Sequence, residues 1–248
     1  MIILRSLLFN FIFYAWATIF LTFHIPYLFG TRERSMIVLQ RWATHARRLM
    51  NIFIGLYYRV EGLEYAQGRP IIIAAKHQSA WDTFIYPDFI KDPALVVKKE
   101  LTLIPLYGHF IKKFELIAVD RKSGGSGLKD MVRQAKKVCF EQNRPLVIFP
   151  EGTRSTPGEK SEYHPGVAAL YSQLKIPVVP VAVNSGVFWG RRSFLKKPGT
   201  IVIKFLPPIQ PGLKREDFME KLETTIETES TKLLNLTKKE GSHEKQKS

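Results

Sequence analysis

The first 29 residues are almost uniformly apolar. Arg5 is the one charged side chain in residues 2–29, where Phe, Ile, Leu, Trp and Tyr dominate. At about 1.5 Å per residue, a helix over residues 7–23 is barely long enough to cross a hydrocarbon core of about 30 Å, so both a membrane span and a shallow hairpin arm fit. Because no Ala-x-Ala-like cleavage site follows, we interpret the segment as a retained anchor rather than a signal peptide. A buried core helix is the alternative, although such helices are rarely this aromatic and this long.

Residues 33–54 predict a second helix, because apolar side chains recur on one helical stripe. The stripe comprises Met36, Leu39, Trp42, Ala43, Ala46, Leu49, Met50 and Phe53, and the rest of the surface carries Arg34, Arg41, Arg47 and Arg48. Such a helix either lies at a membrane interface or packs on its own domain. Next to the apolar first segment, the pattern favours the interface, where guanidinium groups meet lipid phosphates.

From residue 57 onward, short β-rich runs alternate with helical stretches. The predicted strands are 57–61, 70–75, 94–98, 115–119, 146–149, 178–183 and 200–205, and the predicted helices are 79–89, 127–142, 166–174 and 215–236. This alternation indicates an α/β fold with a mixed, largely parallel sheet flanked by helices, and with its site at the carboxyl ends of the strands. We therefore expect membrane-anchoring helices in residues 1–54, one domain in 55–236 and a disordered, polar, Lys-rich tail in 237–248.

The net charge narrows the class of partner, and the cysteine content narrows the class of fold. Among 248 residues, 37 Lys plus Arg face 22 Asp plus Glu, which gives a net charge of +15, and 45% of the residues are apolar. The chain can bury a core, and its partner is expected to be anionic: nucleic acid, anionic lipid headgroups or a phosphorylated metabolite. The single cysteine, Cys139, excludes a disulfide scaffold and is expected to be inert packing.

The first candidate for chemistry is the run from Lys76 to Asp82, which follows the predicted strand 70–75. Ser79 is a natural N-cap, so His77 would lie in the turn before a helix and Asp82 in its first turn. At that spacing a carboxylate can hold one imidazole nitrogen and leave the other free, which is the arrangement of a general base. A capping-box variant beside a solvent-facing histidine is the alternative.

The second candidate is the sequence Phe-Pro-Glu-Gly-Thr-Arg-Ser, residues 149–155, which follows the predicted strand 146–149. Gly152 permits close approach of the backbone to a ligand, Thr153 and Ser155 offer hydroxyl groups, and Arg154 can grip a phosphate with a planar fork of donors. An ordinary turn with a Glu–Arg surface pair is the alternative.

Together these motifs resemble those of the glycerolipid acyltransferase family. The resemblance rests on four motifs in order: His77-x-x-x-x-Asp82, Asp120-Arg121, the run from Phe149 to Ser155, and Val179-Pro180-Val181. It covers residues 54–206, and its bacterial members that acylate 1-acylglycerol 3-phosphate are the most similar. The first motif often opens with Asn in this family, whereas this chain has Lys76.

The resemblance implies roles for individual residues. His77 would take the proton from the free hydroxyl of a lysophospholipid, and Asp82 would orient it. The phosphate-binding residues would be Arg121, Glu151, Gly152, Thr153 and Arg154. Lys98, in a Lys-x-Glu-Leu stretch, would stabilise the oxyanion, whereas the 179–181 run would form strand and acyl-groove wall.

The resemblance further implies acyl transfer from an acyl-CoA or acyl carrier protein thioester to the sn-2 hydroxyl of 1-acylglycerol 3-phosphate, giving phosphatidic acid. Because a thiolate is a good leaving group, the reaction needs a base and an oxyanion site but neither a cofactor nor a metal. No Gly-x-Ser-x-Gly elbow occurs, so Ser79 is read as a cap rather than a nucleophile. The expected location is the cytoplasmic face of a bacterial inner membrane.

A basic, aromatic loop is a further candidate contact with anionic lipid. It contains Arg191, Arg192, Lys196 and Lys197 beside Phe188, Trp189 and Phe194. A plain solvated loop is the alternative.

Three other functions stay open at the level of sequence. One is the same chemistry on another acceptor, such as a lyso-ornithine lipid. The second is a basic nucleic-acid-binding module without catalysis, which predicts salt-sensitive binding. The third is a lipid-surface tether, which would be indifferent to His77→Ala.

Overall fold

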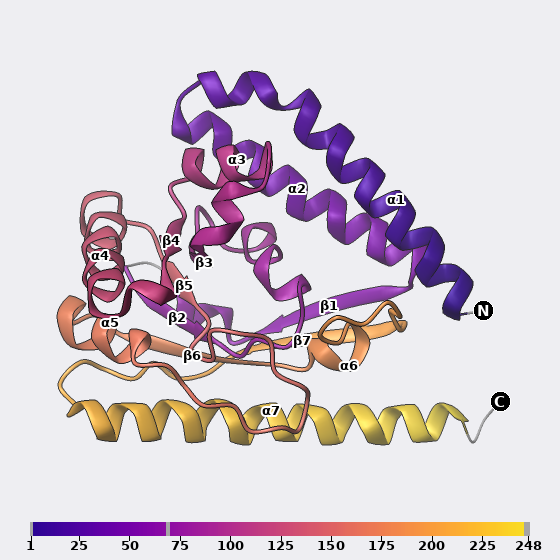
Figure 1. The fold of residues 1–248 in the computed structure, drawn as a ribbon. Coiled ribbons are helices and arrows are strands. Elements are labelled where there is room, and N and C mark those ends of the chain that lie inside the picture. Colours follow the sequence, from indigo (N-terminus) through magenta and orange to yellow (C-terminus); the bar gives the residue numbers. More distant parts are fainter. Residues whose placement is uncertain (1, 68–69, 246–248) are drawn as a thin grey trace.

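The structure of the protein, a computed structural model, describes residues 2–67 and 70–245 (Figure 1). The helices are α1 (Ile2–Phe23), α2 (Arg32–Phe53), α3 (Tyr107–Lys113), α4 (Gly124–Lys136), α5 (Gly166–Leu174), α6 (Ser185–Phe188) and α7 (Arg215–Lys245). The strands are β1 (Leu56–Glu61), β2 (Ile72–Ala75), β3 (Ala94–Lys98), β4 (Ile117–Val119), β5 (Leu146–Ile148), β6 (Val178–Val183) and β7 (Gly199–Phe205). Each strand lies where the sequence predicts one, and the predicted bounds differ by at most two residues.

Within the described residues, the seven strands form one sheet in the order β1-β7-β6-β2-β5-β3-β4. Neighbouring strands are parallel except for β6 and β7, which are antiparallel. The predicted α/β fold with a mixed, largely parallel sheet is therefore confirmed. Because β2, β5 and β6 are parallel neighbours, the segments that follow them meet at one edge of the sheet.

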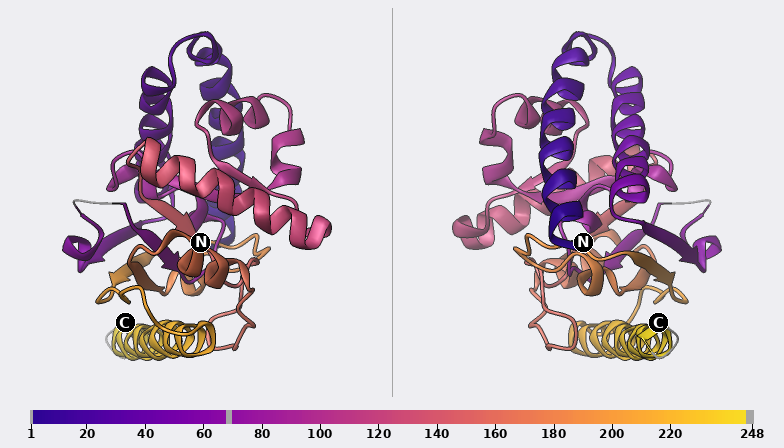
Figure 2. Two further views of the ribbon diagram at one scale, coloured as in Figure 1. Left: turned by 90° about the vertical axis from the view of Figure 1, so that its left-hand side faces the viewer. Right: turned by 90° about the vertical axis from the view of Figure 1, so that its right-hand side faces the viewer.

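Alternation along the strands divides the core between two faces of the sheet. Ile73 and Ala75 face a cluster that includes α1, α2 and the turns after β2, whereas Ile72 and Ala74 face a cluster formed with α4, α5 and α7. Figure 2 shows this layering, with α7 on one side of the sheet and the paired helices α1 and α2 on the other.

The helices α1 and α2 use their apolar surfaces differently. The stripe on α2 is largely buried against α1 and the sheet, with Trp42 and Trp16 ring centroids 4.7 Å apart. Of the two predicted positions for α2, the structure therefore shows packing on its own domain rather than at a membrane interface, because the apolar stripe contacts protein. By contrast, α1 buries one side and exposes apolar side chains on the other, among them Phe11 at 74% and Phe23 at 78% exposure. Within the described residues, α1 is the one helix long and apolar enough to cross a membrane.

Three predicted helices differ from those observed. The helix predicted over 127–142 is α4, which begins at Gly124 and ends at Lys136, followed by a π-helical turn over Lys137–Glu141. Residues 79–89 form two short 3₁₀ turns, Trp81–Thr83 and Tyr86–Asp88, instead of one α-helix. One reason is that the Asp82 carboxylate hydrogen-bonds to the backbone N–H groups that precede it. The other is that Pro87 has no N–H group to donate to a helical hydrogen bond.

At the other end of the chain, α7 continues from the predicted end at residue 236 to Lys245 and includes most of the segment expected to be a disordered tail. Thr237 helps to fix this extension, because its hydroxyl accepts a hydrogen bond from Asn184 Nδ2 at 2.8 Å and donates one to Leu233 O at 2.8 Å. Residues 246–248 lie outside the described residues.

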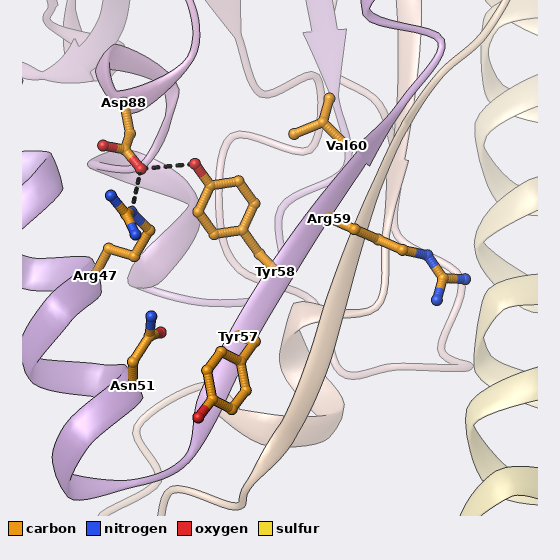
Figure 3. A pocket seen from close by; sticks show the side chains of 7 residues that line it. All are labelled: Arg47, Asn51, Tyr57, Tyr58, Arg59, Val60 and Asp88. Carbon is orange, nitrogen blue, oxygen red and sulfur yellow. Dashed lines mark hydrogen bonds and ion pairs between the residues drawn. The ribbon is translucent and has the colours of Figure 1, made fainter.

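A surface depression of about 420 Å³ lies between α2 and β1. It is lined by Arg47, Asn51, Tyr57, Tyr58, Arg59, Val60 and Asp88, none of which is a predicted site residue (Figure 3). Asp88 accepts hydrogen bonds from Arg47 Nε and the Tyr58 hydroxyl, both at 2.6 Å, and from the Thr44 hydroxyl at 2.7 Å. Asp88 therefore links α2 to β1 and to the 3₁₀ turn that follows Asp82.

Candidate active site

His77 follows β2 directly and lies beside Asp82, as the spacing predicts. Its Nδ1 is 3.1 Å from Asp82 Oδ2, and its ring stacks on Phe149 with centroids 4.2 Å apart. His77 is 8% exposed and Asp82 is buried. Because the carboxylate accepts from Nδ1–H, it selects the tautomer in which Nε2 carries the lone pair.

The Asp82 carboxylate is held by the backbone that precedes it. The same Oδ2 atom accepts the N–H groups of Gln78 and Ser79, both at 2.8 Å. The Ser79 hydroxyl accepts from Trp81 N–H at 3.2 Å, but Ala80, rather than the predicted Ser79, stands at the N-cap of the first 3₁₀ turn. Hydrogen bonds to the preceding backbone thus orient the Asp82 carboxylate toward the imidazole.

The loop after β5 holds the His77 peptide on both sides. Glu151 Oε1 accepts the His77 N–H at 2.9 Å, and the His77 carbonyl accepts from Ser155 N–H at 2.8 Å and from the Ser155 hydroxyl at 3.2 Å. Glu151 is 1% exposed, and burial raises the pKa of its carboxyl, with Lys76 opposing the shift. The sequence predicts Glu151 as a contact for the substrate phosphate. In the structure, however, its side chain faces inward, toward His77.

The backbone at Gly152 lies close to the side chains of Arg121 and His164. Its φ is +62°, and a Cβ at this position would lie 2.6 Å from His164 Cδ2 and 3.1 Å from Arg121 Nη1. Arg121 therefore reaches from the end of β4 across the loop after β5, next to His164. Burial lowers the pKa of the Arg121 guanidinium, and Glu100 opposes the shift, but arginine stays charged at neutral pH.

Three predicted site residues lie at the surface of this region. Thr153 is exposed and Arg154 is half-buried in the same loop as Gly152. Within the part of the chain that the structure describes, neither Arg121 nor Arg154 forms an ion pair with a carboxylate. Lys98 is exposed at the end of β3, and no contact among the described residues joins it to His77 or Asp82. Its proposed role at an oxyanion stays a prediction.

Sequence reasoning missed a buried polar cluster behind His77. Lys76 is 2% exposed, and its Nζ lies 2.6 Å from Glu227 Oε1 and 3.5 Å from Glu151 Oε1. The Tyr163 hydroxyl donates to the same Glu227 oxygen at 3.0 Å. The one sign of this cluster in the sequence was Lys76 itself, which stands where the family motif often has Asn. Its partner Glu227 lies 151 residues away and belongs to no motif.

The basic loop after α6 only partly fits a lipid contact. Arg191, Arg192 and Lys197 are exposed, but Lys196 is 5% exposed and its Nζ donates to backbone carbonyls. Ser6 of α1 accepts the Lys196 N–H at 2.9 Å, so this loop anchors the start of α1.

Cys139 is fully buried in the core, and burial raises the pKa of its thiol to about 12. A thiol with so high a pKa is a weak nucleophile at neutral pH, so the expected packing role is consistent with its surroundings.

The geometry combines a proton acceptor with a cationic surface. His77 Nε2 is the ring nitrogen left to accept a proton, because Nδ1 faces Asp82. The guanidinium group of Arg121 lies beside Gly152 and, among the residues that the structure describes, pairs with no carboxylate. Among the described residues, no group of three or more His, Cys, Asp or Glu side chains is placed to hold a metal ion. This arrangement suits proton abstraction from a substrate with an anionic headgroup.

Comparisons with known proteins agree with this geometry. The model of a family described as Acyltransferase matches residues 58–184, which include all the predicted site residues. Over 194 residues, the chain is 34% identical to a 1-acyl-sn-glycerol-3-phosphate acyltransferase of Pseudomonas aeruginosa, covering 78% of this chain and 74% of that protein. A protein of the same description from Limnanthes douglasii is 29% identical over 70% of this chain and 66% of its own length.

The fold also resembles a solved structure. The crystal structure of the 1-acyl-sn-glycerophosphate (LPA) acyltransferase PlsC from Thermotoga maritima matches with a TM-score of 0.76 at 22% identity, covering 94% of this chain and 98% of that one. With the matches of sequence, these findings favour the acyltransferase over the nucleic-acid-binding alternative. The chain belongs to the acyltransferase family.

Proposed function

We propose that the protein is a 1-acylglycerol-3-phosphate O-acyltransferase. It transfers a fatty acyl group from an acyl-CoA or acyl carrier protein thioester to the sn-2 hydroxyl of 1-acylglycerol 3-phosphate, and the product is phosphatidate. The observation that carries this proposal is the pair of His77 Nδ1 and Asp82 Oδ2, 3.1 Å apart at the edge of the sheet where the loop after β5 also lies. The acceptor named in the descriptions of the relatives supports the choice of substrate.

In this reaction His77 Nε2 removes the proton of the lipid hydroxyl while its oxygen attacks the thioester carbonyl carbon. The Asp82 carboxylate stabilises the imidazolium that forms. As the tetrahedral oxyanion collapses, the C–S bond breaks and the thiolate takes the proton from His77. A positioned base of this kind contributes about 10²- to 10⁴-fold to the rate.

The phosphate of the acceptor binds to the surface around Gly152. Arg121 and Arg154 supply charge-assisted donors, and Gly152 and Thr153 supply close backbone and a hydroxyl group. A carboxylate would repel the phosphate, and Glu151 is buried against the His77 N–H. We therefore assign Glu151 to the support of His77 rather than to the phosphate.

The exposed side of α1 holds the protein on the cytoplasmic face of the membrane. The first turns of α1 are tied to the catalytic domain, because Ser6 and Asn10 bond to the backbone of the loop at residues 194–196. If α1 crossed the bilayer, this loop and its charged neighbours would enter the hydrocarbon. We therefore favour α1 as an arm that lies in the interface over α1 as a span.

Vesicle binding tests this arm. Phe11→Glu places a charge on the exposed side of α1 and is expected to reduce co-sedimentation with vesicles of anionic phospholipid. The matched control is Phe140→Glu, because Phe140 is also exposed, at 54%, but lies after α4. Equal binding by both variants and the wild type would contradict the role of α1.

The transferase activity is tested with purified protein in detergent, labelled acyl thioester and lysophosphatidate. We expect labelled phosphatidate from the wild type and at least about a hundredfold lower kcat for His77→Ala, because the base is lost. His109→Ala is the control, since His109 is an exposed histidine on α3 outside the site. Equal turnover by His77→Ala would refute the mechanism, and faster acylation of a lyso-ornithine lipid would refute the acceptor.

A further inference from the structure

The side chain that precedes the proposed base is a buried lysine between two carboxylates. Lys76 Nζ is 2.6 Å from Glu227 Oε1 and 3.5 Å from Glu151 Oε1, and the Lys76 side chain is 2% exposed. Burial of a lysine is costly unless its charge is matched, so the two carboxylates explain why the ammonium group stays inside.

One of these carboxylates also binds the backbone of the proposed base. Glu151 Oε1, which lies 3.5 Å from Lys76 Nζ, also accepts the His77 N–H at 2.9 Å. The second Glu151 oxygen is buried without a hydrogen-bond partner. On its N–H side, the His77 peptide is therefore held by one carboxylate oxygen, Glu151 Oε1, which also lies 3.5 Å from Lys76 Nζ.

The second carboxylate belongs to the C-terminal helix. Glu227 lies on α7. On this helix Phe218, Leu222 and Ile226 pack in the core cluster on the face of the sheet that is covered by α4, α5 and α7. The Tyr163 hydroxyl donates to the Glu227 oxygen that also binds Lys76. A continuous polar path thus runs from α7 through Lys76 and Glu151 to the His77 N–H.

The charges along this path are interdependent. Burial raises the pKa of the Glu151 carboxyl, and Lys76 is the largest opposing influence. An ionised carboxylate accepts a stronger hydrogen bond from a peptide N–H than a neutral carboxyl does. Loss of the Lys76 charge would therefore weaken the contact that holds the His77 peptide.

We propose that Lys76 is a positioning residue for the acyl transfer: anchored by Glu227 on α7, it fixes the Glu151 carboxylate against the peptide N–H of His77. The inference rests on the proposed function, because the imidazole that it positions is the proposed base. It places α7 in the support of the site, although this helix contributes no residue to the motifs.

The experiment compares Lys76→Met with a matched variant, Lys204→Met. Lys204 on β7 also binds a glutamate of α7, Glu229, with Nζ to Oε1 at 2.6 Å, but it is not connected to His77. For Lys76→Met we expect kcat to fall at least about tenfold while the KM for lysophosphatidate stays within about twofold of the wild type. For Lys204→Met we expect a lower Tm and an unchanged kcat.

The double variant Lys76→Met/Glu227→Met separates positioning from stability. Removal of the Glu227 carboxylate restores part of the Tm, because fewer buried charges lack a partner, but Glu151 still lacks its cation. We expect kcat to stay at the level of Lys76→Met. If kcat recovers together with the Tm, or if Lys76→Met has the kcat of the wild type, the proposal is overturned.

Amide hydrogen exchange at His77 provides a readout that does not depend on turnover. Exchange should be faster in Lys76→Met than in the wild type and unchanged in Lys204→Met. Wild-type protein that makes no phosphatidate refutes the proposed function, whereas unchanged exchange at His77 in Lys76→Met refutes the positioning by Lys76. The two failures are therefore distinguishable.

Discussion

Replacement of Asp82 by Asn removes one charge from the site while keeping an oxygen in place. In the wild type, Asp82 Oδ2 accepts from His77 Nδ1 at 3.1 Å and from the Gln78 and Ser79 N–H groups at 2.8 Å, whereas Oδ1 is buried without a partner. The asparagine oxygen can take the place of Oδ2 and accept the same three donors. Its NH₂ group then occupies the position of Oδ1, where it finds no acceptor.

The cost to catalysis follows from the lost charge. A hydrogen bond to a charged group contributes about 1.5–3 kcal/mol, and the imidazolium of the transition state loses its charged partner in Asp82→Asn. At 1.36 kcal/mol per tenfold in rate, this loss corresponds to about a 10- to 160-fold lower kcat. The buried NH₂ group also lowers the free energy of unfolding by about 1–3 kcal/mol.

The assay measures kcat for phosphatidate formation with both substrates saturating and, separately, unfolding in urea. Asp88→Asn is the matched control, because Asp88 also accepts three hydrogen bonds, in this case from the side chains of Thr44, Arg47 and Tyr58. Figure 3 shows the bonds from Arg47 and Tyr58. The Asp88→Asn variant should lose stability and keep its kcat. The reasoning is refuted if Asp82→Asn keeps kcat within about threefold of the wild type, or if Asp88→Asn loses as much.

Three further predictions follow from contacts, backbone geometry and burial. Gly152→Ala places a methyl group against His164 and Arg121 and imposes a left-handed conformation that costs about 1–2 kcal/mol, so the KM for lysophosphatidate should rise in steady-state kinetics. Burial lowers the pKa of Lys196 from 10.5 to about 8, so between these values the unfolded chain binds a proton that the folded chain has released. The free energy of unfolding of the wild type should therefore rise with pH from 8 to 10 relative to Lys196→Met, as urea unfolding would measure. Native Cys139 should resist a thiol reagent at pH 8 and react on unfolding, because burial raises its pKa to about 12.

The strands were predictable because each is encoded locally. In β2 and β6, apolar residues continue without interruption, which is the pattern of strands buried on both faces. The His77–Asp82 pair was predictable for the same reason, because both partners lie within one turn of the chain.

The predicted helix at 79–89 was wrong because two local preferences compete there. Ser79 and Asp82 match the pattern of a helix start, but in the structure the Asp82 carboxylate turns back to the N–H groups of Gln78 and Ser79. The chain then continues as 3₁₀ turns around the buried side chains of Trp81 and Tyr86. A sequence pattern does not decide between a cap that begins a helix and one that ends in a turn.

Long-range contacts account for what the sequence left undetermined. The tie between Lys76 and Glu227 joins residues 151 positions apart, and the proximity of Arg121 to Gly152 depends on the order of the strands. The apolar stripe of α2 is equally consistent with lipid and with protein as its partner, and only the position of α1 decides for protein.

The loop from Glu151 to Ser155 divides its residues between two tasks. Its first and last members hold the His77 peptide, which lies 74 residues before Glu151, because β2 and β5 are parallel neighbours and end at the same edge of the sheet. Its middle members, Gly152, Thr153 and Arg154, remain free of that contact and lie beside Arg121 or at the surface. Substitutions at the ends of the loop are therefore expected to displace the base and lower kcat. Substitutions in the middle are expected to weaken binding of the substrate headgroup and raise KM.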